Sequence, residues 1–387
     1  MRNEYPLSYH HGGRPLETAR VVRPRTLAAL AQDRALGDLD PAQVCFIDTE
    51  TTGLAGGTGT HVFLVGVGSF SGDHFVVDQY FMEDYDREPA LLEALDDALD
   101  GFCAVVTFNG RAFDLPLLGM RAVLARRRLP LAALVHLDLL PLARRLWGPL
   151  LPSCRLAALE EGVLGEHRVG DIPGHEIPGV YFRYLRDRDA SPLATVFTHN
   201  RQDVLSMVSL LGRLAEEYEA HLQVQGPAAC TWAPAPSTGD DHPSPLGLYG
   251  LGRLYQSTGC EPAAASCYRA ALALGLPEPF ASRAARECVR LLRRLGRRAE
   301  VIDLCCTLAD GPPPDVWALV ELAKELEHGA RDYARALSVV DRALGLTDPD
   351  GPGPPGPPRH TEGLRLDLLR RRARLERRRR RSDPHTA

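Results

Sequence analysis

Three apolar segments between residues 44 and 82 constrain the fold of this chain more than any other feature. VCFID (44–48), HVFLVGVGSF (61–70) and HFVVDQYFM (74–82) each have the length and residue types of a β-strand. A Gly-rich connection and an SGD turn separate them. Consecutive strands joined by turns pair antiparallel, so we predict a three-stranded antiparallel meander.

Helical spacing of apolar residues begins directly after the meander. Residues 88–102 predict a helix, 103–108 a fourth strand, 115–127 a second helix and 134–138 a short strand, and helices continue to about residue 214. The order βββαβα followed by helices predicts an α/β domain built on a mixed sheet, with the meander on one side and parallel crossovers on the other.

The C-terminal half has a different pattern. Residues 225–245 are rich in Pro, Gly and Ser and are typical of an interdomain linker. Beyond them, small and large residues recur at the spacing of a tetratricopeptide helix pair (Leu251, Gly252, Tyr255, Ala264, Tyr268 and Ala271), and weaker copies follow at 288–308 and 322–343. We therefore predict an all-α helical-repeat domain.

These patterns divide the chain into five parts. We expect an N-terminal segment of unassigned role at 1–40, an α/β domain at 41–222, a linker at 223–245, helical repeats at 246–346 and a disordered tail at 347–387. The tail is rich first in Pro and Gly and then in Arg, a composition that argues against a packed core.

Charge is concentrated in that tail. Residues 370–381 hold nine arginines and one glutamate, a local charge of +8, which leaves −13 on the rest of a chain whose net charge is −5. An acidic body argues against nucleic-acid binding over the whole surface. For the arginine run, non-specific contact with nucleic acid and a solvated disordered end both remain open.

Composition also bears on location. The sequence contains no apolar run of the roughly 20 residues that a membrane helix needs, and residues 1–13 lack the order of a signal peptide. The nine cysteines are scattered without a CxxC pair, as expected for reduced residues of a core. We therefore predict a cytoplasmic protein that does not contact a membrane.

The first strand ends in two acids on one face. Side chains alternate along a strand, so Asp48 and Glu50 of FIDTETTGL point to the same side. Two adjacent carboxylates raise each other's pKa unless a cation lies between them, and hard oxygen ligands suit Mg²⁺ or Mn²⁺. The alternative is an ordinary polar end of a strand.

Two later segments carry further polar groups. TFNGRAFDL places Asn109 in a turn after the fourth strand and Asp114 at the start of a helix, either as a third carboxylate or as a simple helix-terminal charge. HNRQDVLSMV places His199 and Asp203 four residues apart, one turn of a helix. Asp138 also ends a strand, and we interpret it as a helix N-cap rather than an additional acid of the site.

In this order the three segments resemble the DEDD superfamily of 3′–5′ exonucleases, which has the ribonuclease-H-like fold. Within that superfamily the chain resembles the YprB-type predicted exonucleases, in which a ribonuclease-H-like domain precedes tetratricopeptide repeats. The resemblance covers residues 41–220 and, more loosely, the repeats. It includes HLDLLPLARRLW (136–147), SCRLAALEEGVLG (153–165) and DIPGHEIP (171–178).

The resemblance implies a metal-dependent exonuclease that hydrolyses phosphodiesters at the 3′ ends of single-stranded DNA or RNA. Asp48, Glu50, Asp114 and Asp203 would hold two Mg²⁺ or Mn²⁺ ions, and His199 would take the proton of the attacking water. In the histidine subgroup the base stands five positions before the last aspartate. Here it stands four before, the spacing of the tyrosine subgroup, so His199 could orient the water instead.

Partners follow from the same resemblance. We expect Thr51, Gly53 and Asn109, which adjoin the acids, to contact the nucleic acid. The repeats would bind a protein, for which a helicase or a repair factor is a plausible class. The alternative is a non-catalytic scaffold that binds nucleic acid through the nuclease fold and recruits partners through the repeats.

Overall fold

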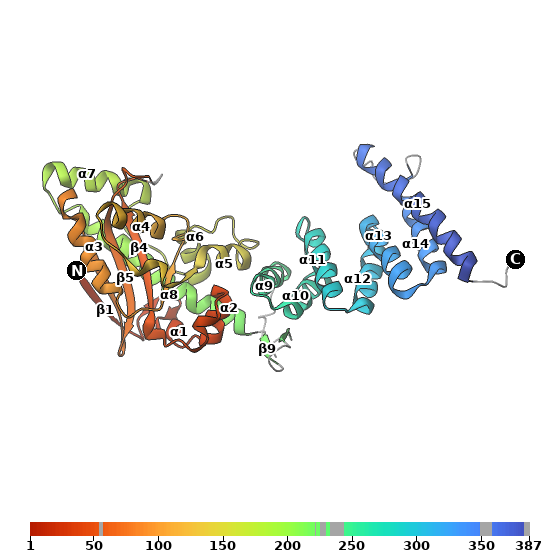
Figure 1. Ribbon diagram of the computed structural model, residues 1–387, viewed down its shortest axis with the longest axis horizontal. Coiled ribbons are helices and arrows are strands. Elements are labelled where there is room, and N and C mark those ends of the chain that lie inside the picture. The colour runs from red at the N-terminus through yellow and green to blue at the C-terminus, as the bar shows by residue number, and fades with distance from the viewer. Residues whose placement is uncertain (54–56, 221, 225–229, 233–243, 349–357, 383–387) are drawn as a thin grey trace. The chain divides into compact units, whose positions relative to one another are not determined.

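The computed structural model describes residues 1–53, 57–220, 222–224, 230–232, 244–348 and 358–382. Most of the predicted linker and the Pro/Gly segment at 349–357 therefore lie outside the described residues. The chain divides into two compact units, Met1–Cys267 and Tyr268–Ala387. Figure 1 shows the elements of each unit.

The first unit is built on a six-stranded mixed sheet in the order β1-β6-β5-β4-β7-β8. Strands β4, β5 and β6 form the predicted antiparallel meander, and β7 and β8 extend it in parallel with β4. The bounds are β1 Arg2–Pro6, β4 Val44–Thr51, β5 Val62–Ser71, β6 His74–Phe81, β7 Ala104–Thr107 and β8 Val135–Asp138. The predicted α/β fold class is thus confirmed.

The N-terminal segment, whose role the sequence left open, supplies an edge of this sheet. Strand β1 pairs antiparallel with β6, with Arg2 opposite Asp78 and Pro6 opposite His74. A small hairpin of β2 (His10–His11) and β3 (Arg14–Pro15) follows, and then helices α1 (Glu17–Arg20) and α2 (Pro24–Ala31). The segment is therefore part of the first unit.

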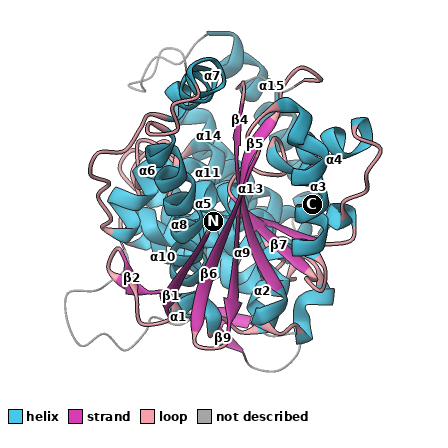
Figure 2. Ribbon diagram, turned by 90° about the vertical axis from the view of Figure 1, so that its left-hand side faces the viewer, coloured by secondary structure: helices cyan, strands magenta, loops and turns pink. Residues whose placement is uncertain are grey.

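Helices cover both faces of the sheet. Helix α8 (Leu193–Ala220) lies against β4, β5 and β6 on one face, and α3 (Glu88–Leu99) and α4 (Asp114–Leu124) cover the other, as Figure 2 shows. Alternation along β4 follows this division. Cys45 and Ile47 join the core formed with α3 and α4, so Phe46, Asp48 and Glu50 face α8.

Two glycines of β5 allow α8 to lie close to the sheet. A Cβ atom at Gly66 would lie 2.4 Å from Asn200 Oδ1, and one at Gly68 would lie 2.5 Å from Val204 Cγ1. A larger residue at either position would push α8 outward. The glycines therefore set the distance between α8 and the acidic end of β4.

The remaining helices of the first unit surround this arrangement. They are α5 (Leu139–Leu146), α6 (Leu156–Leu159), α7 (Ile177–Asp187) and α9 (Pro245–Ser257). Helix α9, which was predicted to belong to the repeats, packs on α5 and α8. A Cβ at Gly250 would lie 2.0 Å from the Leu146 carbonyl oxygen, and Tyr255 donates its hydroxyl to the Tyr218 carbonyl at 2.8 Å.

The described part of the second unit is helical, as predicted. Helix α10 (Glu261–Ala273) runs across the division between the units, and α11 (Phe280–Arg294), α12 (Arg298–Asp310), α13 (Val316–Glu325), α14 (Tyr333–Leu346) and α15 (Pro358–Ser382) follow. From α11 onward each helix packs on the next in sequence. Among the described helices, none is both long and apolar enough to cross a membrane.

Helix α15 corrects the prediction of a disordered arginine tail for residues 358–382. Leu368 and Leu375, two turns apart, are buried, and α15 packs on α14. Arg371 and Arg374 donate to the carboxylate of Glu327, which is fully buried, at 2.5 to 2.8 Å. The sequence did not indicate this helix because arginines dominate the composition of the segment. Its buried apolar face rests on two leucines seven residues apart.

Candidate active site

Strand β4 delivers two acids to the face covered by α8. Asn200 of α8 is fully buried and donates from Nδ2 to Asp48 Oδ2 at 2.8 Å and to the Asp48 carbonyl at 3.2 Å. Asn200 in turn accepts a hydrogen bond at 2.9 Å from Gln79 of β6. Asp48 is thus held by α8 and, through Asn200, is connected to β6, which lies on the far side of β5.

Asp114 approaches from the opposite face of the sheet. It is the first residue of α4, and its carboxylate accepts a hydrogen bond from the hydroxyl of Thr49, the residue between the two acids of β4. Burial raises the pKa of Asp114 to about 6, although the Thr49 bond opposes the shift. The structure therefore brings Asp114 to the same strand end but binds it to Thr49.

Helix α8 carries His199 and Asp203 on one side, as their spacing predicts. The Nδ1 atom of His199 lies 2.8 Å from Asp171 Oδ1, and its Nε2 atom lies 3.7 Å from Asp203 Oδ2. Asp203 also accepts a hydrogen bond from Arg168. Asp171 opens the DIPGHEIP segment, so a sequence signal for it existed, whereas Arg168 had none.

Arg168 links these groups to a buried network. Its guanidinium donates to both oxygens of Glu160, with Nε 2.7 Å from Oε2, and it pairs with Asp171 at 3.1 Å. Glu160 is 1% exposed and also accepts from the Ser206 hydroxyl, which lies 2.7 Å from His11 Nε2. The N-terminal segment, α8 and the short π-helix Glu160–Leu164 therefore fix Arg168 together.

The acids of the site repel one another. Burial is the largest cause that raises the pKa of Asp48 well above its ordinary value, and the charges of Asp203, Glu50 and Asp114 add to it. Burial and the charges of Asp203 and Asp114 raise the pKa of Glu50 in the same way. Such a cluster favours either protonation or a bound cation.

The chemistry of this donor set fits a divalent cation, since carboxylate oxygens are the ligands that Mg²⁺ and Mn²⁺ prefer. The described residues nevertheless contain no three His, Cys, Asp or Glu side chains that converge closely enough to hold one ion. The hydrogen bonds supply a reason, because Asn200, Thr49 and Arg168 each bind one of the acids. The acids would have to exchange these partners for a metal ion.

A cavity of about 510 Å³ opens beside the acids. Its lining includes Asp48, Asp203, Phe108, Asn109, Arg144 and Arg155. Asn109 has the left-handed φ of 69°. The structure thus places one of the three residues predicted to contact nucleic acid in the cavity. The Thr51 hydroxyl donates instead to the Gly53 carbonyl at 2.8 Å. This hydrogen bond holds the backbone directly after β4.

Asp138 organises the cavity wall from strand β8. Its carboxylate accepts from the backbone of Asn109 at 2.8 Å and of Arg111 at 3.1 Å, and from Leu140 at 3.1 Å in the first turn of α5. The interpretation of Asp138 as a helix N-cap is therefore confirmed. The same carboxylate fixes the turn that carries Asn109.

The mixed sheet between α8 and the pair α3 and α4 is a ribonuclease H-like architecture, and comparison with known proteins identifies the same class. The family model described as the RNase H superfamily matches residues 45–215. This superfamily indicates a nuclease-like hydrolase that acts on nucleic acid, and its members typically use divalent metals.

A relative extends the likeness over most of the chain. The sequence is 31% identical over 348 residues to "Uncharacterized protein YprB" of Bacillus subtilis (strain 168), and this match covers 88% of the chain and 79% of the relative. The chain therefore belongs to the YprB family, with a ribonuclease H-like region followed by a helical one.

Proposed function

We propose that this chain is a divalent-metal-dependent exonuclease that removes nucleotides from the 3′ ends of single-stranded DNA or RNA. One observation carries the proposal. Asp48, Glu50, Asp114 and Asp203 meet at one end of β4, close enough that their charges raise the pKa of the first two. The cost of burying uncompensated carboxylates is tolerated mainly at functional sites.

The four carboxylates would hold the metal ions. Two divalent ions, when bound, lower the pKa of an attacking water and stabilise the leaving 3′ oxygen. Release of Asp203 from Arg168 and of Asp114 from Thr49 would turn these side chains toward Asp48. Asn200 would keep Asp48 in place meanwhile, because its bonds run to the buried side of the strand end.

His199 would take the proton of the water. Its Nδ1 lies closer to Asp171 Oδ1, at 2.8 Å, than to the donor Arg168 Nη1, at 3.3 Å, and the aspartate favours the tautomer that carries its proton on Nδ1. The other nitrogen, Nε2, is then the basic one, and it faces Asp203. Orientation by Asp171 supports a base at the unusual spacing of four residues.

One observation favours the alternative of a non-catalytic scaffold. The ion pair between Arg168 and Asp203 neutralises one of the proposed metal ligands within the protein. A nuclease fold locked in this state would still bind nucleic acid without cutting it. Hydrolysis must therefore be tested directly.

The test uses purified full-length protein with 5′-labelled single-stranded DNA and RNA, in Mg²⁺ or Mn²⁺ and in EDTA. We expect a ladder that shortens from the 3′ end only with metal, and loss of at least about 100-fold in rate in Asp48→Asn. Asp97→Asn, an exposed acid of α3, is the matched control and should cleave normally. Binding without cleavage, or equal cleavage by Asp48→Asn, would contradict the proposal.

We further propose that α11 to α14 are tetratricopeptide-like and bind a protein, with a helicase or repair factor as the class suggested by the resemblance. A hollow of about 420 Å³ lined by Arg286, Arg290, Trp317 and Glu321 supports this. The guanidinium of Arg286 lies 5.3 Å from the centre of the Trp317 ring. A stoichiometric complex with a candidate partner that forms with the wild type but not with Arg290→Glu would support it, and equal binding would oppose it.

A further inference from the structure

We propose that Arg144 and Arg155 form a phosphate-binding pair that holds the backbone of a single strand in the cavity beside Asp48 and Asp203. This inference rests on the proposed function in one respect: the bound nucleic-acid strand is the substrate strand, whose 3′ end reaches Asp48 and Asp203. Both arginines lie in segments that the family resemblance covers, 136–147 and 153–165, but the resemblance implied no role for either of them.

Two separate elements place the arginines at this cavity. Arg144 lies in the last turn of α5, the helix whose start is capped by Asp138, and Arg155 immediately precedes α6. Both side chains are exposed, and both line the cavity that also contains Asp48 and Asp203. Cationic and acidic groups therefore share one hollow.

Within the described residues neither guanidinium has a carboxylate partner, in contrast to the buried arginines Arg121 and Arg168. Arg121 pairs with Glu88 at 2.5 Å and Arg168 pairs with three acids. Among the described residues, neither Arg144 nor Arg155 forms an ion pair. These two positive charges thus remain available to a ligand.

A third guanidinium strengthens the positive charge at this wall. Arg253 of α9 donates to the Arg144 carbonyl at 3.1 Å and to the Arg145 carbonyl at 3.3 Å. Burial raises the pKa of the nearby Cys154 thiol, and the charges of Arg144 and Arg253 oppose that rise. The packing of α9 on α5 therefore adds a cation beside the cavity.

The ligand class follows from this chemistry. Guanidinium binds phosphate through two parallel hydrogen bonds, and a polyanion needs such contacts to approach a body that is acidic outside its arginine helix. Phe108 offers a ring on which a base can stack, and stacking is independent of base identity. The volume of about 510 Å³ lies in the range of about 300 to 1,000 Å³ of small-ligand sites. A strand end with its last phosphates matches these features.

The test measures binding in the absence of cleavage. A 5′-labelled single-stranded oligonucleotide of 20 nucleotides is titrated with the full-length chain in EDTA. Binding is followed by fluorescence anisotropy at a series of salt concentrations. We expect Arg144→Gln with Arg155→Gln to weaken binding at least about tenfold at low salt. The plot of the logarithm of the binding constant against the logarithm of the salt concentration has a negative slope. The magnitude of this slope should decrease by about 1.4, which is about 0.7 for each lost phosphate contact on a single strand.

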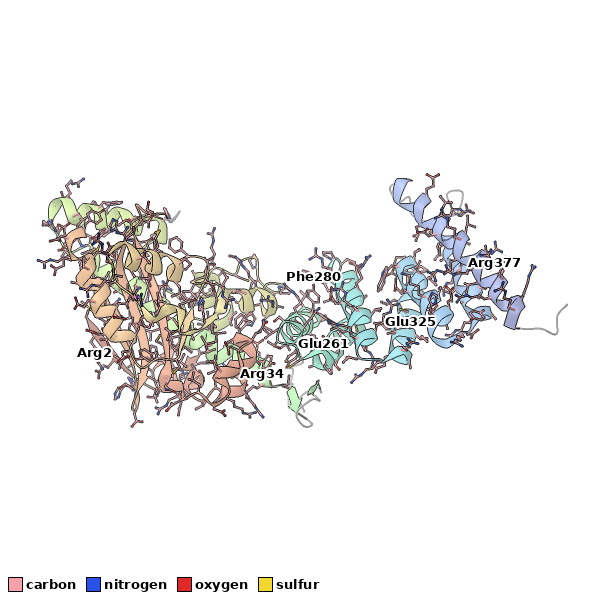
Figure 3. All side chains as sticks on the ribbon, in the orientation of Figure 1. Arg2, Arg34, Glu261, Phe280, Glu325 and Arg377 are labelled. Atoms are coloured by element: carbon pink, nitrogen blue, oxygen red, sulfur yellow. The ribbon has the colours of Figure 1, made fainter. Side chains whose placement is uncertain are left out.

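The matched control is Arg25→Gln with Arg34→Gln, which removes the same charge from exposed positions outside the cavity (Arg34 is labelled in Figure 3). This variant should bind within about twofold of the wild type, since only a global charge effect remains. Circular dichroism shows whether each variant is folded, and Arg144→Lys with Arg155→Lys should recover part of the affinity because lysine retains the charge.

The outcomes separate this inference from the proposed function. Unchanged affinity and salt slope in the glutamine variant, or equal weakening in the control, would overturn the phosphate site. If the wild type binds through these arginines but never cleaves with metal, the phosphate site stands and the exonuclease proposal fails. If the glutamine variant binds normally but cleaves slowly, the arginines do not act through phosphate binding.

Discussion

Arg168 offers the sharpest test of how the candidate site is held together. Its guanidinium is 9% exposed and bonds to Glu160, Asp171 and Asp203, and Glu160 is 1% exposed. In Arg168→Met the apolar part of the side chain is kept, but the charge that compensates Glu160 is lost. Removing one partner of a buried pair costs about 3 to 5 kcal/mol because the other charge is left buried and uncompensated.

Hydrogen exchange measured by mass spectrometry is a suitable assay because it reports on α8 separately from the second unit. A loss of about 3 to 5 kcal/mol corresponds to roughly 150- to 5,000-fold faster exchange in the core of α8, if these amides exchange by unfolding of the first unit. Adding Glu160→Gln should restore a large part of the protection, since the uncompensated charge is then gone.

The control is Arg188→Met, which breaks a surface pair with Asp84 whose side chains are 57% and 38% exposed. Exposed pairs contribute about 0 to 1 kcal/mol, so exchange should rise by less than about fivefold. Exchange in Arg168→Met that matches this control would refute the inference that Arg168 and Glu160 stabilise α8.

Three further predictions concern pH, the arginine helix and the base. Burial raises the pKa of Asp114 to about 6, so the folded state holds this proton more tightly than the unfolded state, whose pKa is near 4. The protonated carboxyl therefore stabilises the fold fully below about pH 4, and this contribution is lost as pH rises through about 6. Urea unfolding in EDTA should show a smaller fall in stability between pH 4 and 6 for Asp114→Asn than for the wild type. Arg374→Ala should destabilise the second unit by about 1 to 3 kcal/mol in chemical denaturation because buried Glu327 loses two hydrogen bonds, whereas exposed Arg380→Ala should be neutral. His199→Ala should retain a trace of metal-dependent hydrolysis in the labelled-strand assay, and full activity would exclude it as the base.

Much of the fold was predictable because its signals are local. The strands of the meander, the helices at 88–99 and 114–124 and the helical C-terminal region follow from periods of 2 and 3.6 residues along the sequence. The shared face of Asp48 and Glu50 and the alignment of His199 with Asp203 follow from the same periods. The N-cap role of Asp138 followed from its position at a strand end before a helix.

What escaped the sequence depends on contacts between distant segments. Arg168 lies 35 residues from Asp203, and the residues of β1 pair with residues of β6 that are 68 to 76 positions away. Helix α15 could not be inferred because a run of arginines predicts solvation unless an acid such as Glu327 is buried opposite it.

The sequence by itself determined which residues alternate, which lie one turn apart and which acids end the strands, because each of these depends only on local backbone geometry. Only the tertiary structure decided which partner each acid has. Thr49 binds Asp114 on one face of the sheet, and Arg168 binds Asp203 on the other. The packing of α5 brings Arg144 to the cavity that Asp48 and Asp203 line. Burial makes those pairings strong, and burial is a property of the folded chain rather than of any one segment.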